Sequence, residues 1–226
     1  MSLATFFNGY KKFGIFFSIL CLVIIGIIYS VLNQKQPLPI WNPESVNMEM
    51  VDESIRHVSK YHTIADFSLT NQNGKTITQD DYKDKIYVAD FFFTTCQTIC
   101  PIMTDHMYKI QSATFKDDEV LLLSHSVTPV KDSVPVLKAY AKEKGVVDRK
   151  WNLVTGDKKQ IYKLARKSYL AVKEDGNGDI YDMIHTENFL LIDKKRQIRG
   201  FYDGTKPEDI EQLLEDIETL KYFGGS

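Results

Sequence analysis

Cysteine is scarce in this sequence, and neither sign of charge predominates. Only 3 cysteines occur among 226 residues, and one of them, Cys21, lies near the N-terminus. Small secreted folds that depend on disulfides carry many more cysteines, so this chain does not need such cross-links for its size. Lys and Arg total 28 against 30 for Asp and Glu, a formal net charge of -2. Without a basic excess there is no electrostatic case for binding nucleic acid.

Charge is entirely absent from one long segment near the N-terminus. Residues 13–32 read FGIFFSILCLVIIGIIYSVL and have the length that a transmembrane helix needs. Lys11 and Lys12 precede the segment, and positive charge on a short flank favours a cytoplasmic N-terminus. We therefore expect residues 1–12 in the cytoplasm and the rest of the chain to be exported. The alternative is a cleaved signal peptide, but the apolar run is long for one and no small-x-small cleavage site follows.

This arrangement predicts a single-pass protein of the bacterial inner membrane with a C-terminal periplasmic domain. Residues 33–60 include NQKQPLPIWNP, a polar stretch whose prolines favour extended geometry, and we expect them to form a linker. Residues 61–226 then form one domain of ordinary size.

Buried strands and amphipathic helices alternate along the predicted domain. The continuous apolar run KIYVADFFF, residues 85–93, is typical of a central strand that is buried on both faces. Asn73-Gly74 is a strong turn signal between two alternating runs. Further strands are expected over 119–127 and 151–156, helices over 102–115, 132–145, 157–169 and 206–223, and hairpins over 66–78, 170–182 and 187–203. The pattern predicts an α/β fold, a mixed central sheet flanked by helices, with a thioredoxin-like layout.

The remaining two cysteines lie at the predicted junction of a strand and a helix, in FFFTTCQTICP. Backbone N–H groups at a helix start favour the thiolate, which is both a nucleophile and a metal ligand. If the helix begins at Cys96, the spacing places both sulfurs on one face; if it begins later, the loop must bring Cys96 to Cys100. A structural disulfide would close a very small loop and contribute about 2 kcal/mol or less. A redox couple and half of a metal site both remain open.

A metal site would need a third ligand beside the two cysteines. Thiolates are soft ligands that suit Cu(I) and Zn, and two sulfurs rarely complete a site. The histidines of the exported part fall in different predicted elements, and spacing alone does not choose among them. His57 and His62 lie in or next to the linker, His106 on a helix, His125 inside a buried strand where a satisfied core residue is expected, and His185 on a loop beside a strand.

Several segments together resemble the SCO/SenC family over most of the exported domain. DFFFTTCQTICPIMT resembles the strand, CxxxCP loop and helix of that family, and LLLSHSVTPVKDSVPVLKAYAKEKG resembles its next strand, turn and helix. WNLVTGDK resembles a following strand with a Thr-Gly-Asp turn. IHTENFLLIDKKRQIRGFYDG resembles the segment that carries the family's single metal-binding histidine.

The resemblance implies a thioredoxin-like fold and a copper site formed by Cys96, Cys100 and His185. Cys96 and Cys100 are also expected to be able to close a disulfide and so to act as a redox pair, which would destroy the copper site. Members of the family deliver copper to, or reduce, the CuA centre of cytochrome c oxidase. The implied partners are the CuA-bearing subunit and other copper chaperones or thiol reductants. One departure is Thr128, where many members have Asp.

Three functions remain open at this point. The chain is a copper chaperone, a thiol–disulfide oxidoreductase, or a sensor of copper or redox stress. Thioredoxins usually place two residues between their cysteines, whereas three intervene here. We favour the copper chaperone, with thiol–disulfide exchange on the oxidase subunit as an accompanying activity, and we do not expect a classical enzyme.

Overall fold

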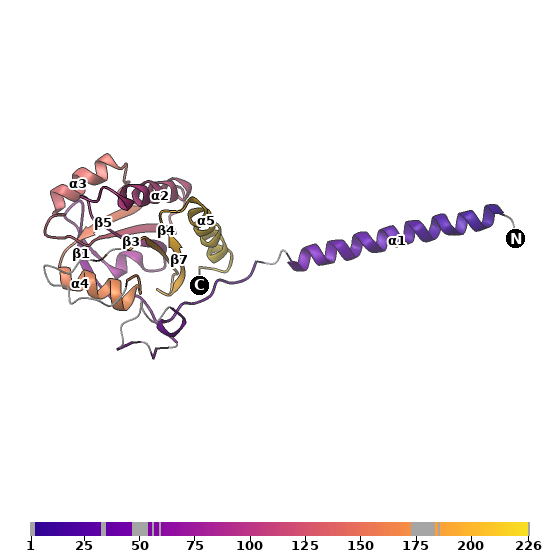
Figure 1. The fold of residues 1–226 in the computed structure, drawn as a ribbon, viewed down its shortest axis with the longest axis horizontal. Helices are drawn as coiled ribbons and strands as arrows, with labels where there is room; N and C mark the ends of the chain where they lie inside the picture. The colour runs from indigo at the N-terminus through magenta and orange to yellow at the C-terminus, as the bar shows by residue number, and fades with distance from the viewer. Residues whose placement is uncertain are drawn as a thin grey trace. The chain divides into compact units, whose positions relative to one another are not determined.

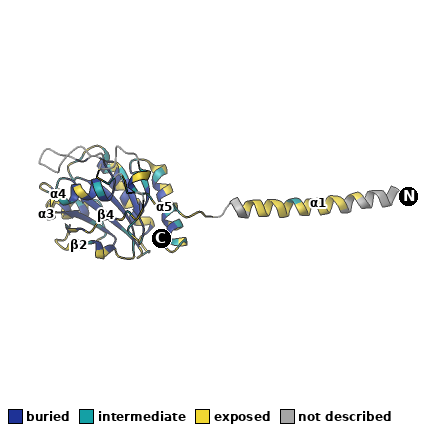
Figure 2. Cartoon of the chain, turned by 90° about the horizontal axis from the view of Figure 1, so that it is seen from below, coloured by how far each residue is buried: buried dark blue, intermediate teal, exposed yellow. Residues whose placement is uncertain are grey.

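The computed structural model of the protein describes residues 3–32, 35–46, 54, 55, 57, 58, 60–172, 184 and 186–225. It separates into two compact units, Met1–Gln36 and Pro37–Ser226. The first unit contains helix α1 (Leu3–Leu32). Its described large apolar side chains, from Phe13 to Tyr29, are exposed (Figure 2). Among the described residues, no helix combines the length and apolarity required to cross a membrane.

Within the described residues, the second unit is built on a seven-stranded mixed sheet. Its strands are β1 (Ser68–Asn71), β2 (Thr76–Thr78), β3 (Ile86–Phe92), β4 (Val120–Ser126), β5 (Trp151–Thr155), β6 (Asn188–Ile192) and β7 (Ile198–Asp203). They lie in the order β2-β1-β5-β4-β3-β6-β7. The three central strands β3, β4 and β5 are parallel, and the remaining pairs are antiparallel. The prediction of a mixed sheet is confirmed.

Helices cover both faces of this sheet (Figure 1). They are α2 (Ile99–Ala113), α3 (Val134–Glu143), α4 (Lys158–Lys163) and α5 (Pro207–Tyr222), with short helical turns η1 (Pro43–Ser45) and η3 (Gln79–Tyr82) and a π-helical turn η4 (Leu164–Ser168). Side chains alternate between the faces along a strand. Val88 of β3 therefore packs in the apolar layer beneath α2, α3 and α5, while Ala89 packs in the layer that includes α4.

Two predicted hairpins are confirmed, and a third falls outside the described residues. β1 and β2 pair around Asn73-Gly74, where Gly74 adopts a φ of 75° that favours glycine. β6 and β7 pair across the turn at Lys194–Arg196. Of the hairpin expected over 170–182, residues 173–182 lie outside the described part of the chain.

Part of the predicted linker is attached to the domain. The Trp41 N–H donates to a carbonyl of β7 at 2.9 Å, and the Trp41 ring packs edge-on against Phe201. Arg199, 4 % exposed, donates to the carbonyls of Leu38 and Pro39. β7 is an edge strand, and this segment pairs with one of its backbone groups, the Ile198 carbonyl. The compact unit therefore begins at Pro37, and the sequence-based boundary at residue 61 lies inside it.

Candidate metal and redox site

The loop between β3 and α2 brings the two cysteines together. Helix α2 begins at Ile99, so Cys96 lies in the loop and Cys100 in the first helical turn. The backbone N–H of Cys100 donates to Cys96 Sγ at 3.4 Å, and Thr98 Oγ1 lies 3.6 Å from the same sulfur. The side chain of the N-cap residue Thr98 accepts no hydrogen bond from the helix. The Cys96 sulfur thus takes the place of the usual capping oxygen at this helix start.

The pKa values of the two thiols are shifted in opposite directions from the ordinary value of a cysteine. Partial burial raises the pKa of Cys96, but hydrogen bonds from the Cys100 thiol and from the backbone N–H groups of Cys100 and Thr98 outweigh it and lower this pKa to about 7. Deeper burial, together with donation to Cys96, raises the pKa of Cys100 to about 12. Near neutral pH, Cys96 is therefore the more readily ionised of the two thiols, while Cys100 keeps its proton. Both are free thiols in this structure, and the disulfide between them stays a prediction.

A fully buried carboxylate connects this loop to the end of β4. Asp132 accepts hydrogen bonds from both the N–H and the hydroxyl of Thr94, which precedes Cys96 by two residues, and from the hydroxyls of Ser126 and Thr128. Thr128 thus supplies one of the hydroxyl donors to Asp132. No sequence signal identified Asp132, because 38 positions separate it from Thr94.

A second buried acid, Asp90, lies on the face of β3 that packs under α2. It is 3 % exposed, and its Oδ1 has no hydrogen-bond partner among the described residues. Burial raises the pKa of Asp90 to about 7, against a smaller opposing effect of a hydrogen bond from Ser124. The negative charge of Asp90 in turn adds to the high pKa of Cys100. Sequence reasoning missed Asp90, although one acid inside the apolar run KIYVADFFF was a usable signal.

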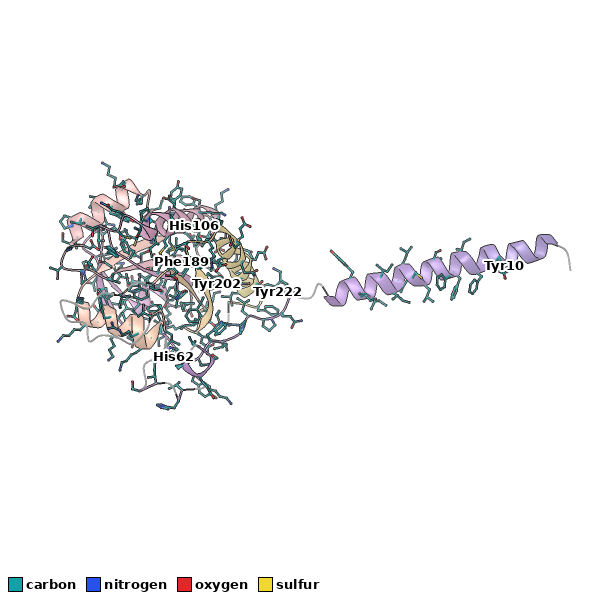
Figure 3. The ribbon with its side chains drawn as sticks, viewed as in Figure 1. Tyr10, His62, His106, Phe189, Tyr202 and Tyr222 are labelled. Carbon is teal, nitrogen blue, oxygen red and sulfur yellow. The ribbon has the colours of Figure 1, made fainter. Side chains whose placement is uncertain are left out.

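Two of the candidate histidines are bound to backbone carbonyls. His62 Nε2 lies 2.7 Å from the carbonyl oxygen of Ser168, and His106 Nδ1 lies 2.7 Å from that of Gly204. These two histidines lie on opposite sides of the sheet (Figure 3). Neither contacts the cysteines in the hydrogen bonds that the structure shows, and His57 is exposed.

His125 is a core residue, as predicted, but it is not fully satisfied. It is 0 % exposed and stacks on Phe91 with ring centroids 4.9 Å apart. Its Nε2 has no partner among the described residues. Burial lowers the pKa of His125 to about 4, so the ring is neutral at physiological pH. The expectation of a satisfied histidine was therefore wrong at one ring nitrogen.

The third predicted ligand, His185, lies outside the described residues. Its neighbours Ile184 and Thr186 are both buried, and β6 begins shortly afterwards at Asn188. Within the described ranges, no group of three or more His, Cys, Asp or Glu side chains is arranged to hold a metal ion. The described part of the site is therefore the pair Cys96 and Cys100. These two sulfurs fit a soft metal ion such as copper.

Comparisons with a family model and with solved structures all identify the same family. The family model described as SCO1/SenC matches residues 56–221. A solved SCO1/SenC family lipoprotein from Bacillus anthracis is 32% identical, with a TM-score of 0.62 over 71% of this chain and 95% of that one. BsSco, described as having a disulfide switch and as a member of the Sco family of cytochrome c oxidase assembly proteins, is 29% identical, with a TM-score of 0.60 over 70% and 92%.

A third solved relative contains the metal. Bradyrhizobium japonicum ScoI, determined with copper bound, is 28% identical, with a TM-score of 0.54 over 69% of this chain and 98% of that chain. The α/β architecture predicted from the sequence is thus that of solved relatives, including one that holds copper.

Proposed function

The chain belongs to the SCO1/SenC family, and on that premise we propose that it binds copper through Cys96, Cys100 and His185 for the assembly of cytochrome c oxidase. The observation that carries the proposal is the hydrogen bond of 3.4 Å from the Cys100 N–H to Cys96 Sγ, because it places both sulfur ligands at one helix start. The copper-bound relative and the assembly role stated for BsSco support the choice of metal and process.

The chemistry of the pair supports copper as a transferable cargo. Two thiolates and one imidazole suit Cu(I), whose affinity for soft ligands is high. Copper binding must displace the proton of Cys100, whereas Cys96 is already about half ionised near pH 7, so binding releases protons and strengthens as pH rises. Cys96 is half-buried, which leaves the metal accessible to a partner's ligands.

Oxidation of the two thiols would couple metal binding to redox state. Forming a disulfide removes two electrons and two protons from Cys96 and Cys100 and consumes both sulfur ligands. The same pair can therefore hold copper or exchange a disulfide, but cannot do both at once. The second candidate function, reduction of the oxidase's CuA cysteines, is favoured by the low pKa of Cys96 and by the switch described for BsSco.

The ligand set is tested by loading the reduced full chain with Cu(I) and comparing it with His185→Ala and Cys96→Ser. Both variants should lose affinity and change the copper spectrum. Affinity and spectrum that are unchanged in His185→Ala would remove His185 from the site. Transfer to a purified CuA domain tests delivery separately. Disulfide turnover that is lost in Cys96→Ser but insensitive to His185→Ala, without copper transfer, would favour the reductase.

We also propose that residues 13–32 anchor the domain to the outer face of the bacterial inner membrane. The support is the uncharged apolar sequence with Lys11 and Lys12 on its N-terminal flank. A reporter enzyme that is active only outside the cytoplasm, fused to the C-terminus, should be active and should sediment with membranes. An inactive reporter, or one released by an alkaline wash, would refute the anchored orientation.

A further inference from the structure

Asp132 is a fully buried acid that is stabilised by hydrogen-bond donors alone. Its Oδ1 accepts the Thr94 hydroxyl at 2.5 Å, and its Oδ2 accepts the Thr94 N–H at 3.3 Å. Oδ2 also accepts the hydroxyls of Ser126 at 2.5 Å and Thr128 at 2.9 Å. None of the ion pairs found among the described residues includes Asp132. A buried carboxylate that accepts four hydrogen bonds is strongly held in one place.

These hydrogen bonds connect two loops at the carboxyl ends of neighbouring parallel strands. Thr94 follows β3, and Ser126 is the last residue of β4. β3 and β4 are already joined here, because the Val127 N–H donates to the carbonyl of Phe92 at 2.9 Å. By binding both Thr94 and Ser126, Asp132 also holds the start of the cysteine loop against the carboxyl end of β4. It therefore reaches the loop at the place where the strand hydrogen bonds have ended.

The contact with Thr94 is close to the reactive sulfur. Only Thr95 separates Thr94 from Cys96, and the Cys96 N–H donates to the carbonyl of Phe93 at 3.3 Å. Because both the backbone N–H and the side chain of Thr94 are held, rotation of this short turn is restricted. The conformation of this turn affects where Cys96 Sγ lies relative to the N–H of Cys100.

We propose that Asp132 is a positioning residue for Cys96. It fixes the Thr94 turn so that Cys96 Sγ meets the start of α2 and the Cys100 thiol. The copper-binding consequence rests on the function proposed above, whereas the thiol–disulfide consequence does not. Asp132 acts through Thr94 and does not touch the reacting atoms.

The sharpest test compares two threonines that are held in the same way. Thr205 also gives its N–H and its hydroxyl to one aspartate, Asp203, at 2.9 and 2.6 Å, but in the turn between β7 and α5. Thr94→Val and Thr205→Val each delete one hydroxyl donor to a carboxylate while keeping the side-chain volume. Asp203 is partly exposed and also pairs with Lys206, so Thr205→Val should cost less stability than Thr94→Val. The two variants are therefore compared at the thiols, under conditions in which both are fully folded.

The readout is the equilibrium of the full chain, in a Cys21→Ser background, with glutathione. One glutathione disulfide oxidises the dithiol of Cys96 and Cys100 to a disulfide and yields two reduced glutathiones. We expect Thr94→Val to lower this equilibrium constant about fivefold or more, because a hydrogen bond to a charged group that holds the turn is lost. Thr205→Val should leave it within about twofold. Equal constants for the two variants, or no change in Thr94→Val, would overturn the proposal.

Conservative replacements provide a second, independent measurement. In Asp132→Asn the amide oxygen can still accept the Thr94 N–H, and the amide N–H₂ can donate to the Thr94 hydroxyl, which turns to accept. Asn should therefore keep a near wild-type glutathione equilibrium and Cu(I) spectrum, whereas Asp132→Ala should alter both. If Asp132→Ala does not fold, Thr94→Ser, which retains the hydroxyl, should restore what Thr94→Val loses.

Failure of the two proposals can be distinguished. A wild-type chain that binds no copper would refute the proposed function, while the glutathione comparison would still decide the role of Asp132. If copper binds normally but Asp132→Asn behaves like Asp132→Ala, the negative charge of Asp132 matters and positioning alone is refuted.

Discussion

Cys96 Sγ accepts the backbone N–H of Cys100 across 3.4 Å, so the first sulfur of the pair caps the helix that carries the second. The N-terminus of a helix has a partial positive charge that favours a thiolate. Together with the hydrogen bond from the Cys100 thiol, this contact lowers the pKa of Cys96, and it brings the two residues together.

The first prediction concerns the order in which the thiols react. In a Cys21→Ser background, iodoacetamide should alkylate Cys96 well before Cys100, because the pKa of Cys96 is about 7 and that of Cys100 about 12. The rate at Cys96, followed by peptide mass spectrometry, should rise with pH to a plateau with a midpoint near 7. Cys100→Ala, which removes a donor to Cys96, should move this midpoint upwards. Faster labelling of Cys100 would contradict the assignment.

Asp90 makes the fold less stable as pH rises. Its folded-state pKa of about 7 lies above the ordinary value of 3.8, so the folded state binds the extra proton between these values. The stabilising contribution is complete below about pH 4 and is lost as pH rises to about 7. Asp90→Asn, which resembles the protonated acid, should be more stable than wild type at pH 8 by on the order of a few kcal/mol.

Urea denaturation followed by the fluorescence of buried Trp151 checks this prediction. The difference between Asp90→Asn and wild type should grow from pH 4 to pH 7 and then level off. A difference that does not change with pH would show that Asp90 titrates normally.

His125 has the opposite effect to Asp90, because it makes the fold less stable as pH falls. Burial lowers its pKa from 6.5 to about 4, so the unfolded state binds the proton first and stability is lost as pH falls from about 6.5 to about 4. His125→Phe should keep the aromatic stack on Phe91 and lose less stability over that pH range. The same urea titration measures it, and a pH dependence identical to that of wild type would exclude a neutral buried His125.

We expect the attachment of residues 38–41 to β7 to depend on Arg199. Arg199 and Asp193 form a buried ion pair at 2.8 Å, and Arg199 also donates to two carbonyls of the segment. Arg199→Ala should cost about 3–5 kcal/mol of unfolding free energy, because Asp193 is left buried without its partner. Hydrogen exchange of the Trp41 amide should accelerate as the segment detaches from β7.

An exposed ion pair provides the control for this variant. Arg196 pairs with Asp66, but these side chains are 39% and 86% exposed. Arg196→Ala should therefore change stability by about 1 kcal/mol or less and leave the Trp41 amide protected. Similar effects of the two variants would mean that Arg199 contributes no more than a surface contact.

The sequence predicted those features that depend on neighbouring residues. The run KIYVADFFF identified β3, because an apolar run of this length is typical of a strand that is buried on both faces. Asn73-Gly74 identified the first hairpin, because Gly74 allows the positive φ of the turn. The position of Cys96 and Cys100 between a strand and a helix followed from the same local patterns.

The features that were missed depend on contacts between distant residues. The parallel register of β3 and β4 places Phe91 opposite His125, and no local pattern specifies it. Asp132 meets Thr94 only once the ends of β3 and β4 lie side by side, and Arg199 reaches Pro39 across 160 positions. The start of α2 at Ile99 was left open, because its cap is a sulfur and not a conventional capping oxygen. The family resemblance, not spacing, selected His185.

X-ray absorption spectroscopy of the copper-loaded, reduced full chain tests the central claim most directly. We predict two sulfur scatterers and one imidazole nitrogen around Cu(I) in the wild-type protein. We further predict loss of the nitrogen in His185→Ala and loss of one sulfur in Cys96→Ser. A copper shell without sulfur, or an imidazole contribution that persists in His185→Ala, would contradict a site formed by Cys96, Cys100 and His185.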